Sequence, residues 1–184
     1  MILRLFRRRA EDGTIAALYG VIVAQARSPA FYAAYGVPDT VQGRFDLVVL
    51  HMVLLLRRLG RGSAAARSLG QRLFDAFCRD LDGNLREMAI GDLAVPRHMR
   101  HFAEAFYGRQ AAYLAALESA DGRAFENALA RNIFAVSEPD DRAVRLARYA
   151  CAAARELDAR REEDLAAARL GFPDPEAFIN QAHG

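Results

Sequence analysis

The feature that most restricts the fold of this chain is an apolar run of ten residues, LVVLHMVLLL, from Leu47 to Leu56. The run is too short to cross a bilayer, because the apolar core of a membrane needs about 20 residues. Charged residues bound it, with Asp46 before it and Arg57 and Arg58 after it. A helix that is apolar on all its faces belongs in the middle of a bundle, so this run is predicted to be the central helix of an α-helical fold.

The rest of the 184-residue chain also favours an all-α fold. Gly and Pro are sparse and scattered, and few stretches alternate between apolar and polar residues with a period of two. Apolar residues make up 53% of the chain and charged residues 26%, which is the balance of a globular domain with a sizeable core. No repeat or internal linker divides the sequence. We therefore predict a single-domain helical bundle of about seven or eight helices.

Capping and turn residues set the expected boundaries of the helices. Helices are predicted over residues 14–27, 29–35, 39–59, 64–88, 96–118, from 121 through 133, over 139–160, and again in the tail. Asp39 is expected to cap the third of these helices, with Gln42 three residues later. Asp121 and Asp174 are expected to cap the sixth helix and the tail helix.

The N-terminal segment, residues 1–12, has the basic and partly apolar sequence MILRLFRRRAED. We expect it to be flexible, to start a packed helix, or to contact a membrane, with its apolar side chains in the surface and its Arg residues on anionic lipid. It also imitates a signal peptide, but two acidic residues interrupt its basic region. Ile15, Leu18 and Ile22 then follow at the spacing of an amphipathic helix, so export is disfavoured.

The segment DLDGNLREMAIGD, Asp80 to Asp92, places two acids and an Asn at alternate positions, as a calcium loop does. An EF-hand requires Gly at its sixth position and Glu at its twelfth, whereas this segment has Leu and Gly there. In a helix, Asp82 and Arg86 lie one turn apart and can form an ion pair. The segment is therefore interpreted as a polar helix end followed by an ordered turn.

Three segments carry a family resemblance. They are FYAAYGVPDTVQGRFDLVVLHMVLLLRRL, LFDAFCRDLDGNLREMAIGDLAVPRHM and AEAFYGRQAAYLAAL, and they contain GVPDT, GRFDL, NLREM and FYGR in that order. In these residues the chain resembles the ubiquinol–cytochrome c chaperone family, strongly over residues 18–117 and more loosely in the C-terminal third. It departs from the family in Ala89, where Gly is usual, and in Pro-Arg-His-Met, which replaces a more Lys-rich segment.

The resemblance implies a non-enzymatic assembly chaperone without a cofactor. Its client, meaning the protein that it holds, would be newly made cytochrome b, and it would support the assembly of ubiquinol–cytochrome c reductase, respiratory complex III. Residues 13–184 would form one helical chaperone domain, as in the short bacterial members. The expected location is cytoplasmic, or peripheral on the inner face of the cytoplasmic membrane. A second assembly factor, the ribosome and the membrane surface are further expected partners, whereas DNA is not, since the net charge is only +2.

Ten residues that core packing does not explain are candidates for partner binding. They are Pro38, Asp39, Arg44, Asp46, Asp82, Arg86, Glu87, Asp92, Tyr107 and Arg109. The competing interpretation makes them caps, turns and internal ion pairs. In that interpretation Arg44 pairs with Asp46, and Arg86 pairs with Asp82.

A basic patch, made of Arg97, His98, Arg100 and His101, opens the helix predicted over residues 96–118. Positive charge is unfavourable at a helix N-terminus, so we expect the patch to meet acidic partner groups, lipid headgroups or RNA phosphate. The two His side chains share one face of the helix. The adjacent Arg residues oppose metal binding and no third ligand is placed, so no metal site is predicted.

Two kinds of residue are expected in the core rather than in a site. His51 lies mid-helix among apolar residues, which is typical of a hydrogen-bonded core histidine. Cys78 and Cys151 lie inside helical patterns, so both are expected to be buried free thiols.

Two alternative functions stay open. The chain could be a peripheral membrane or ribosome-associated binding module with another client, which would use the basic N-terminus and the basic patch. It could also be a hydrolase in which Asp82, Glu87 and Asp92 meet in a cleft. No nucleophile motif, phosphate loop or metal set accompanies these acids, so the sequence disfavours catalysis and no catalytic residue is assigned.

Overall fold

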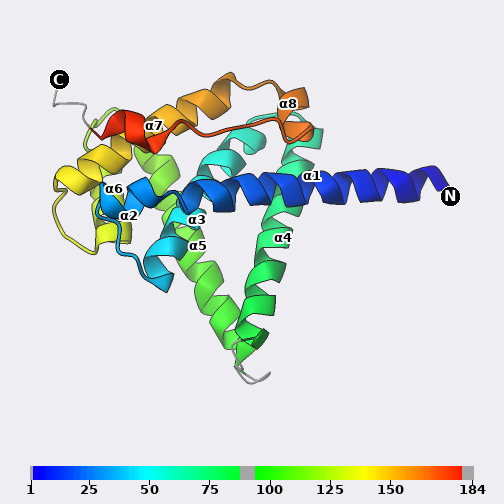
Figure 1. The fold of residues 1–184 in the computed structure, drawn as a ribbon, viewed down its shortest axis with the longest axis horizontal. Helices are drawn as coiled ribbons and strands as arrows, with labels where there is room; N and C mark the ends of the chain where they lie inside the picture. Colours follow the sequence, from blue (N-terminus) through cyan, green and yellow to red (C-terminus); the bar gives the residue numbers. More distant parts are fainter. Residues whose placement is uncertain (1, 88–93, 180–184) are drawn as a thin grey trace.

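The structure, a computed structural model, describes residues 2–87 and 94–179, with side chains from residue 12 onward. Its elements are α1 (Ile2–Ala26), α2 (Pro29–Ala33), α3 (Val41–Gly60), α4 (Ala64–Glu87), α5 (Val95–Glu118), α6 (Ala124–Leu129), the π-helix η1 (Ala130–Phe134), α7 (Asp141–Ala159), α8 (Glu162–Ala166) and the 3-10 turn η2 (Pro175–Phe178). Within the described ranges there is no strand. The prediction of an all-α, single-domain bundle is confirmed (Figure 1).

Helix α3 is the centre of the bundle. It contacts α1, α4, α5 and α7, and Figure 1 shows α1 crossing in front of it. The side chains of its apolar run are buried from Leu47 to Leu55, apart from the half-buried Val48. In the described part of the chain, no helix combines the length and the apolarity that a membrane span requires.

Helix α1 is longer than the sequence predicted, because its backbone is helical from Ile2 rather than from about residue 14. Ile15, Leu18 and Ile22 are buried, as the spacing predicted, so this helix packs through its second half. Its first turns project beyond the rest of the molecule (Figure 1). A lipid contact of residues 1–12 stays a prediction.

The start of α3 is held by a tight turn. Thr40, and not Asp39 as predicted, is its N-cap, since the Thr40 hydroxyl accepts a hydrogen bond of 3.1 Å from the backbone N–H of Gly43. A Cβ at position 43 would lie only 2.0 Å from the carbonyl oxygen of Pro38. Only glycine therefore allows this turn to close on the helix, which fixes where α3 begins.

The C-terminal half contains two departures from the predicted boundaries. The helix expected from residue 121 through 133 starts later, with Arg123 as its N-cap, and it divides into α6 and η1. The Asp121 carboxylate instead accepts from the backbone N–H of Arg123 in the preceding turn. At the tail, Asp174 is the N-cap as predicted, although it caps the short turn η2.

A buried polar chain ties α1, α3 and α7 together. The His51 ring is fully buried, with Nδ1 2.7 Å from the Leu47 carbonyl oxygen and Nε2 2.7 Å from the hydroxyl of Tyr149. The Gln25 amide donates to the same hydroxyl at 2.9 Å. Desolvation lowers the pKa of His51 to about 4, so the ring is neutral, donates from Nδ1 and accepts the Tyr149 proton at Nε2. The prediction of a satisfied core histidine is confirmed.

We predict that Tyr149→Phe destabilises the fold by about 1–3 kcal/mol, because it leaves the buried His51 Nε2 without its donor. Urea unfolding followed by circular dichroism measures the change. Tyr107→Phe is the matched control, since Tyr107 is 55% exposed, and it should leave the unfolding midpoint unchanged. Equal midpoints for the two variants would contradict the role given to the buried chain.

Candidate binding groove

A groove of about 650 Å³ opens where the start of α3 meets the end of α4, the first half of α5 and η1. Its lining is mostly apolar. The apolar residues include Val41, Phe45, Leu81, Leu85, Met99, Phe102, Ile133 and Phe134. The polar residues include Gln42, Asp46, His98, His101, Arg109, Arg131 and Asn132.

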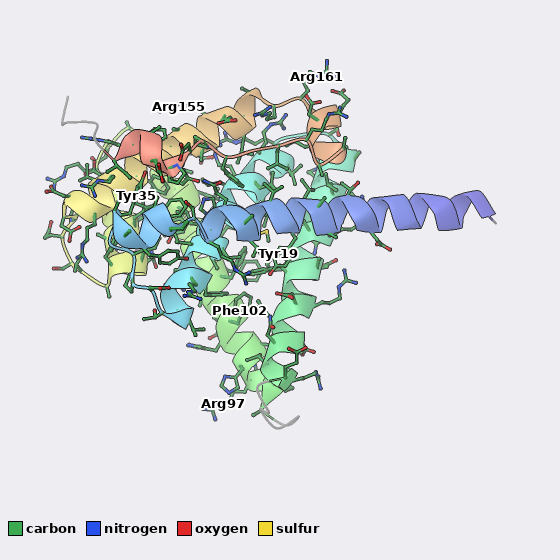
Figure 2. The ribbon with its side chains drawn as sticks, viewed as in Figure 1. Tyr19, Tyr35, Arg97, Phe102, Arg155 and Arg161 are labelled. Atoms are coloured by element: carbon green, nitrogen blue, oxygen red, sulfur yellow. The ribbon has the colours of Figure 1, made fainter. Side chains whose placement is uncertain are left out.

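The apolar wall of the groove is the edge of an aromatic cluster. Phe45 and Phe102 meet edge to face with 5.1 Å between their ring centroids, and both contact the buried ring of Phe77. Phe102 points from α5 into the body of the molecule (Figure 2). Val41, at the rim, is 83% exposed. Because the exposed Val41 adjoins this wall, the apolar lining of the groove connects the hydrophobic core with the surface of the protein.

The polar floor of the groove is an ion pair between Asp46 of α3 and Arg109 of α5, with 2.9 Å between Oδ1 and a terminal guanidinium nitrogen. The side chain of Asp46 is 4% exposed and that of Arg109 is 16% exposed. The Gln42 amide also donates to Asp46 at 2.8 Å. Burial raises the pKa of Asp46, and Arg109 and Gln42 oppose that rise. The carboxylate is therefore already satisfied from within the protein.

The groove gathers several predicted site residues and leaves others outside. Pro38, Asp46 and Arg109 line it, as do His98 and His101 of the basic patch. Arg97 and Arg100 are exposed on the same end of α5 but do not line the groove; Figure 2 shows Arg97 at the far tip of that helix.

The predicted pairing of Arg44 with Asp46 is wrong. Arg44 pairs instead with Asp39 at 2.7 Å, and both side chains are exposed, whereas Asp46 pairs with Arg109. Helical geometry explains the difference, because residues two apart on a helix point in different directions. Arg44 faces solvent from the same turn of α3 that buries Asp46.

The end of α4 behaves as a polar helix end. Asp82 and Arg86 form the predicted ion pair at 2.8 Å, and Asp80 accepts hydrogen bonds from Tyr19 at 2.8 Å and from Asn84 at 3.2 Å. Glu87 is exposed at the last residue of α4. Asp92 lies outside the described residues. Among the residues described, no group of three or more His, Cys, Asp or Glu side chains is placed to hold a metal.

Tyr107 belongs to a different surface from the groove. It lies on α5 against Phe74 of α4, with 5.8 Å between the ring centroids, and lines a separate hollow of about 340 Å³. That hollow shares no lining residue with the groove. The predicted site residues therefore fall on at least two faces of the molecule.

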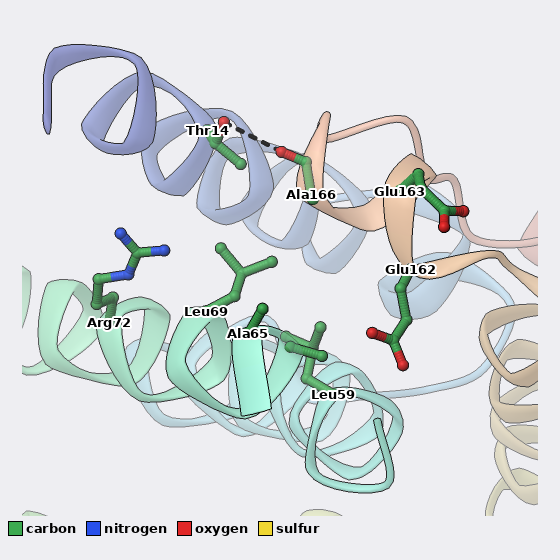
Figure 3. A pocket seen from close by; sticks show the side chains of 9 residues that line it. Thr14, Leu59, Ala65, Leu69, Arg72, Glu162, Glu163 and Ala166 are labelled. Carbon is green, nitrogen blue, oxygen red and sulfur yellow. Dashed lines mark hydrogen bonds between the residues drawn. The ribbon is translucent and has the colours of Figure 1, made fainter. Parts of the chain in front are cut away.

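A third hollow, of about 350 Å³, lies between α1, α4 and α8 (Figure 3). Its polar groups hold the fold together. Glu162 accepts from the backbone N–H of Ser63 at 3.0 Å and from its hydroxyl at 2.6 Å, and the Thr14 hydroxyl donates to the carbonyl of Ala166 at 3.3 Å. This hollow is where α8 docks on the bundle.

The sequence did not identify the residues that form the apolar wall of the groove and its edge at η1. Val41 and Phe45 lie inside the helix predicted over residues 39–59 and Phe102 inside that over 96–118, and a helix prediction does not say which side chains stay uncovered. Arg131 and Asn132 lie in the C-terminal third, where the sequence resembles the family only loosely. Cys78 and Cys151 are free, as expected, but both are only partly buried.

Comparison with known proteins identifies the family. The family model for the ubiquinol–cytochrome C chaperone matches residues 33–172, which include the groove and the central helix. This chain belongs to the ubiquinol–cytochrome c chaperone family. A solved structure of similar fold is that of the Cbp3 homologue from Brucella abortus, with a TM-score of 0.85 and 40% sequence identity over 96% of this chain and 98% of that one. No curated protein matches the chain.

We predict that Arg109→Ala destabilises this chaperone by about 3–5 kcal/mol at neutral pH, because it leaves the Asp46 carboxylate buried and unpaired. Without Arg109 the pKa of Asp46 rises further, and protonation relieves the buried charge. The difference in unfolding free energy between variant and wild type should therefore shrink as the pH falls through that raised pKa. Arg44→Ala, which breaks only an exposed pair, should leave the unfolding midpoint unchanged. A loss of unfolding free energy in Arg109→Ala that stays constant with pH would contradict this explanation.

Proposed function

We propose that this chaperone is non-enzymatic and binds newly made cytochrome b, supporting the assembly of respiratory complex III. The family and the similarity to the Cbp3 homologue support a chaperone for ubiquinol–cytochrome c reductase. Cytochrome b is a hydrophobic multi-helix protein. A protein that holds it before its partners arrive needs a stable body with an exposed surface that is partly apolar and partly charged.

The observation that carries this proposal is the groove. Its wall of Phe45, Phe102 and Phe134 gives an apolar segment a place to bury its side chains, and Val41 extends that wall to the surface. A groove between helices suits an amphipathic or apolar helix, which presents its side chains at intervals of three and four residues. The groove is small beside a whole membrane protein, so we propose that it holds one segment of the client.

A catalytic role has little support in the described geometry. Both ring nitrogens of His51 are engaged and the ring is fully buried. Asp82 is paired with Arg86 on a helix surface, and Glu87 is exposed. Of the three acids in the hydrolase hypothesis, the two that the structure describes do not line the groove.

A contact with the membrane surface or the ribosome fits two features and is compatible with the main proposal. The first turns of α1 project from the body, and their sequence is basic and apolar. Arg97 and Arg100 are exposed at the start of α5. We propose a cytoplasmic protein that works on the inner face of the cytoplasmic membrane, where a second assembly factor can join it.

The test is to tag the chain in its own host, solubilise the membranes gently and identify co-purifying proteins by mass spectrometry. We expect cytochrome b to be enriched with the wild type and at least tenfold reduced with Val41→Asp, because the client would then bury a carboxylate. Asp at the first position of α3 interacts favourably with the helix dipole, so the fold should be retained. Circular dichroism checks this.

The matched control is Tyr107→Ser, which removes the other large apolar side chain exposed in the described residues. It should leave the enrichment of cytochrome b unchanged. Loss with Tyr107→Ser but not with Val41→Asp would move the client to the separate hollow that Tyr107 lines. Absence of cytochrome b from the wild-type sample, in cells that are making complex III, would reject the proposed client.

A further inference from the structure

We propose that the groove selects an apolar helix that carries an acidic side chain, and that Arg131 is the residue that recognises this acid. This inference rests on the proposed function and adds the chemistry of the client segment. It depends on the charges left over in the groove once the internal contacts are made.

The described residues that line the groove carry an unbalanced charge. From α3 it receives one acid, Asp46, which Arg109 and Gln42 already satisfy. From α4 it receives only Leu81 and Leu85. The charges of Asp46 and Arg109 cancel, so the net charge of the groove must come from the residues on its rim.

The rim residues supply donors and positive charge. Arg131 is exposed and has no ion-pair partner among the side chains that the structure describes. His98 and His101 lie exposed on the facing wall, and each ring carries at least one N–H donor in any protonation state. Among the described residues, a segment that enters the groove therefore meets a net positive charge and a surplus of donors.

The backbone around Arg131 has an unusual geometry. Arg131 lies in the single turn of π-helix η1, a geometry that is rare and often found at functional sites. The next residue, Asn132, donates to the carbonyl of Ala128 at 2.8 Å, and the turn ends at Ala135 in the left-handed conformation, with φ of 54°. A left-handed Ala costs roughly 1 kcal/mol or more, which the surrounding packing must offset. Arg131 is thus presented from an ordered turn.

The apolar part of the lining decides what kind of acid fits. A free acid or a soluble acidic peptide would leave the wall of Phe45, Phe102 and Phe134 unused. An apolar helix with one Glu or Asp uses both parts, since its apolar side chains fill the wall while the carboxylate reaches the Arg131 guanidinium. Arginine binds carboxylates through paired N–H groups, and the attraction grows when the bound helix excludes water.

The test uses three synthetic helical peptides of about 20 residues that share one Leu- and Ala-rich face. They differ at one central position, which is Glu, Gln or Lys. Binding to the full chain is measured by fluorescence anisotropy. We expect the Glu peptide to bind about tenfold more tightly than the Gln peptide and the Lys peptide to bind most weakly, with the spread narrowing at high salt.

Charge reversal at the rim provides the decisive comparison. Arg131→Glu should invert the order, so that the Lys peptide binds most tightly. Val41→Asp should weaken the Glu and Gln peptides. The matched control is Arg155→Glu, which changes an exposed Arg on α7, at the edge of the molecule opposite Arg97 in Figure 2. This control variant changes the net charge by the same amount and should keep the wild-type order of peptide affinities.

Three results would overturn the inference. The first is equal binding of the three peptides, and the second is a wild-type order of peptide affinities that persists in Arg131→Glu. The third is a small apolar molecule that native mass spectrometry finds bound to the purified chain and that no peptide displaces. The peptide experiment contains no cytochrome b. Discrimination among peptides without enrichment of cytochrome b would therefore reject only the proposed client, whereas enrichment without discrimination would reject only this inference.

Discussion

The burial of α3 is the interaction on which the rest of the structure depends. Because most of its apolar run is buried, α1, α4, α5 and α7 must pack around it, and their positions follow from its length and direction. The N-terminal turn of α3 is not covered by neighbouring helices in the same way, since it lines the open groove. One helix thus organises the core at one end and carries the rim of the groove at the other.

Two buried polar contacts complement that apolar packing. The chain of Gln25, Tyr149 and His51 joins α1 and α7 to the middle of α3, and the pair of Asp46 and Arg109 joins α5 to its start. Buried polar groups stabilise only when every donor and acceptor is satisfied, so each contact permits one relative placement of its helices. The second contact lies directly beneath the groove, which links the shape of the groove to the placement of α5 against α3.

The sequence predicts the helices well and the groove poorly, for identifiable reasons. An apolar run and helical spacing report burial within one helix, so α3 and the packed half of α1 were predictable. Pairing between distant segments has no such signal, and Asp46 was therefore assigned to the nearby Arg44 instead of Arg109. The choice of Thr40 over Asp39 as N-cap depends on the close approach of Gly43 to Pro38, which only the folded chain shows. The π-turn at Arg131 also lacks a sequence pattern that would distinguish it from ordinary helix.

A groove suits a chaperone only if it keeps its shape while empty and releases its client when assembly proceeds. The internal pairing of Asp46 answers the first need, because the floor requires no partner to satisfy its buried charge. The modest size of the groove answers the second, since a few apolar anchors give a weaker complex than a large interface would. An exposed Arg131 at the rim then adds selectivity more than affinity, because electrostatic complementarity mainly discriminates between partners. The surface that remains when the core and the internal pairs are complete is thus suited to transient, selective binding.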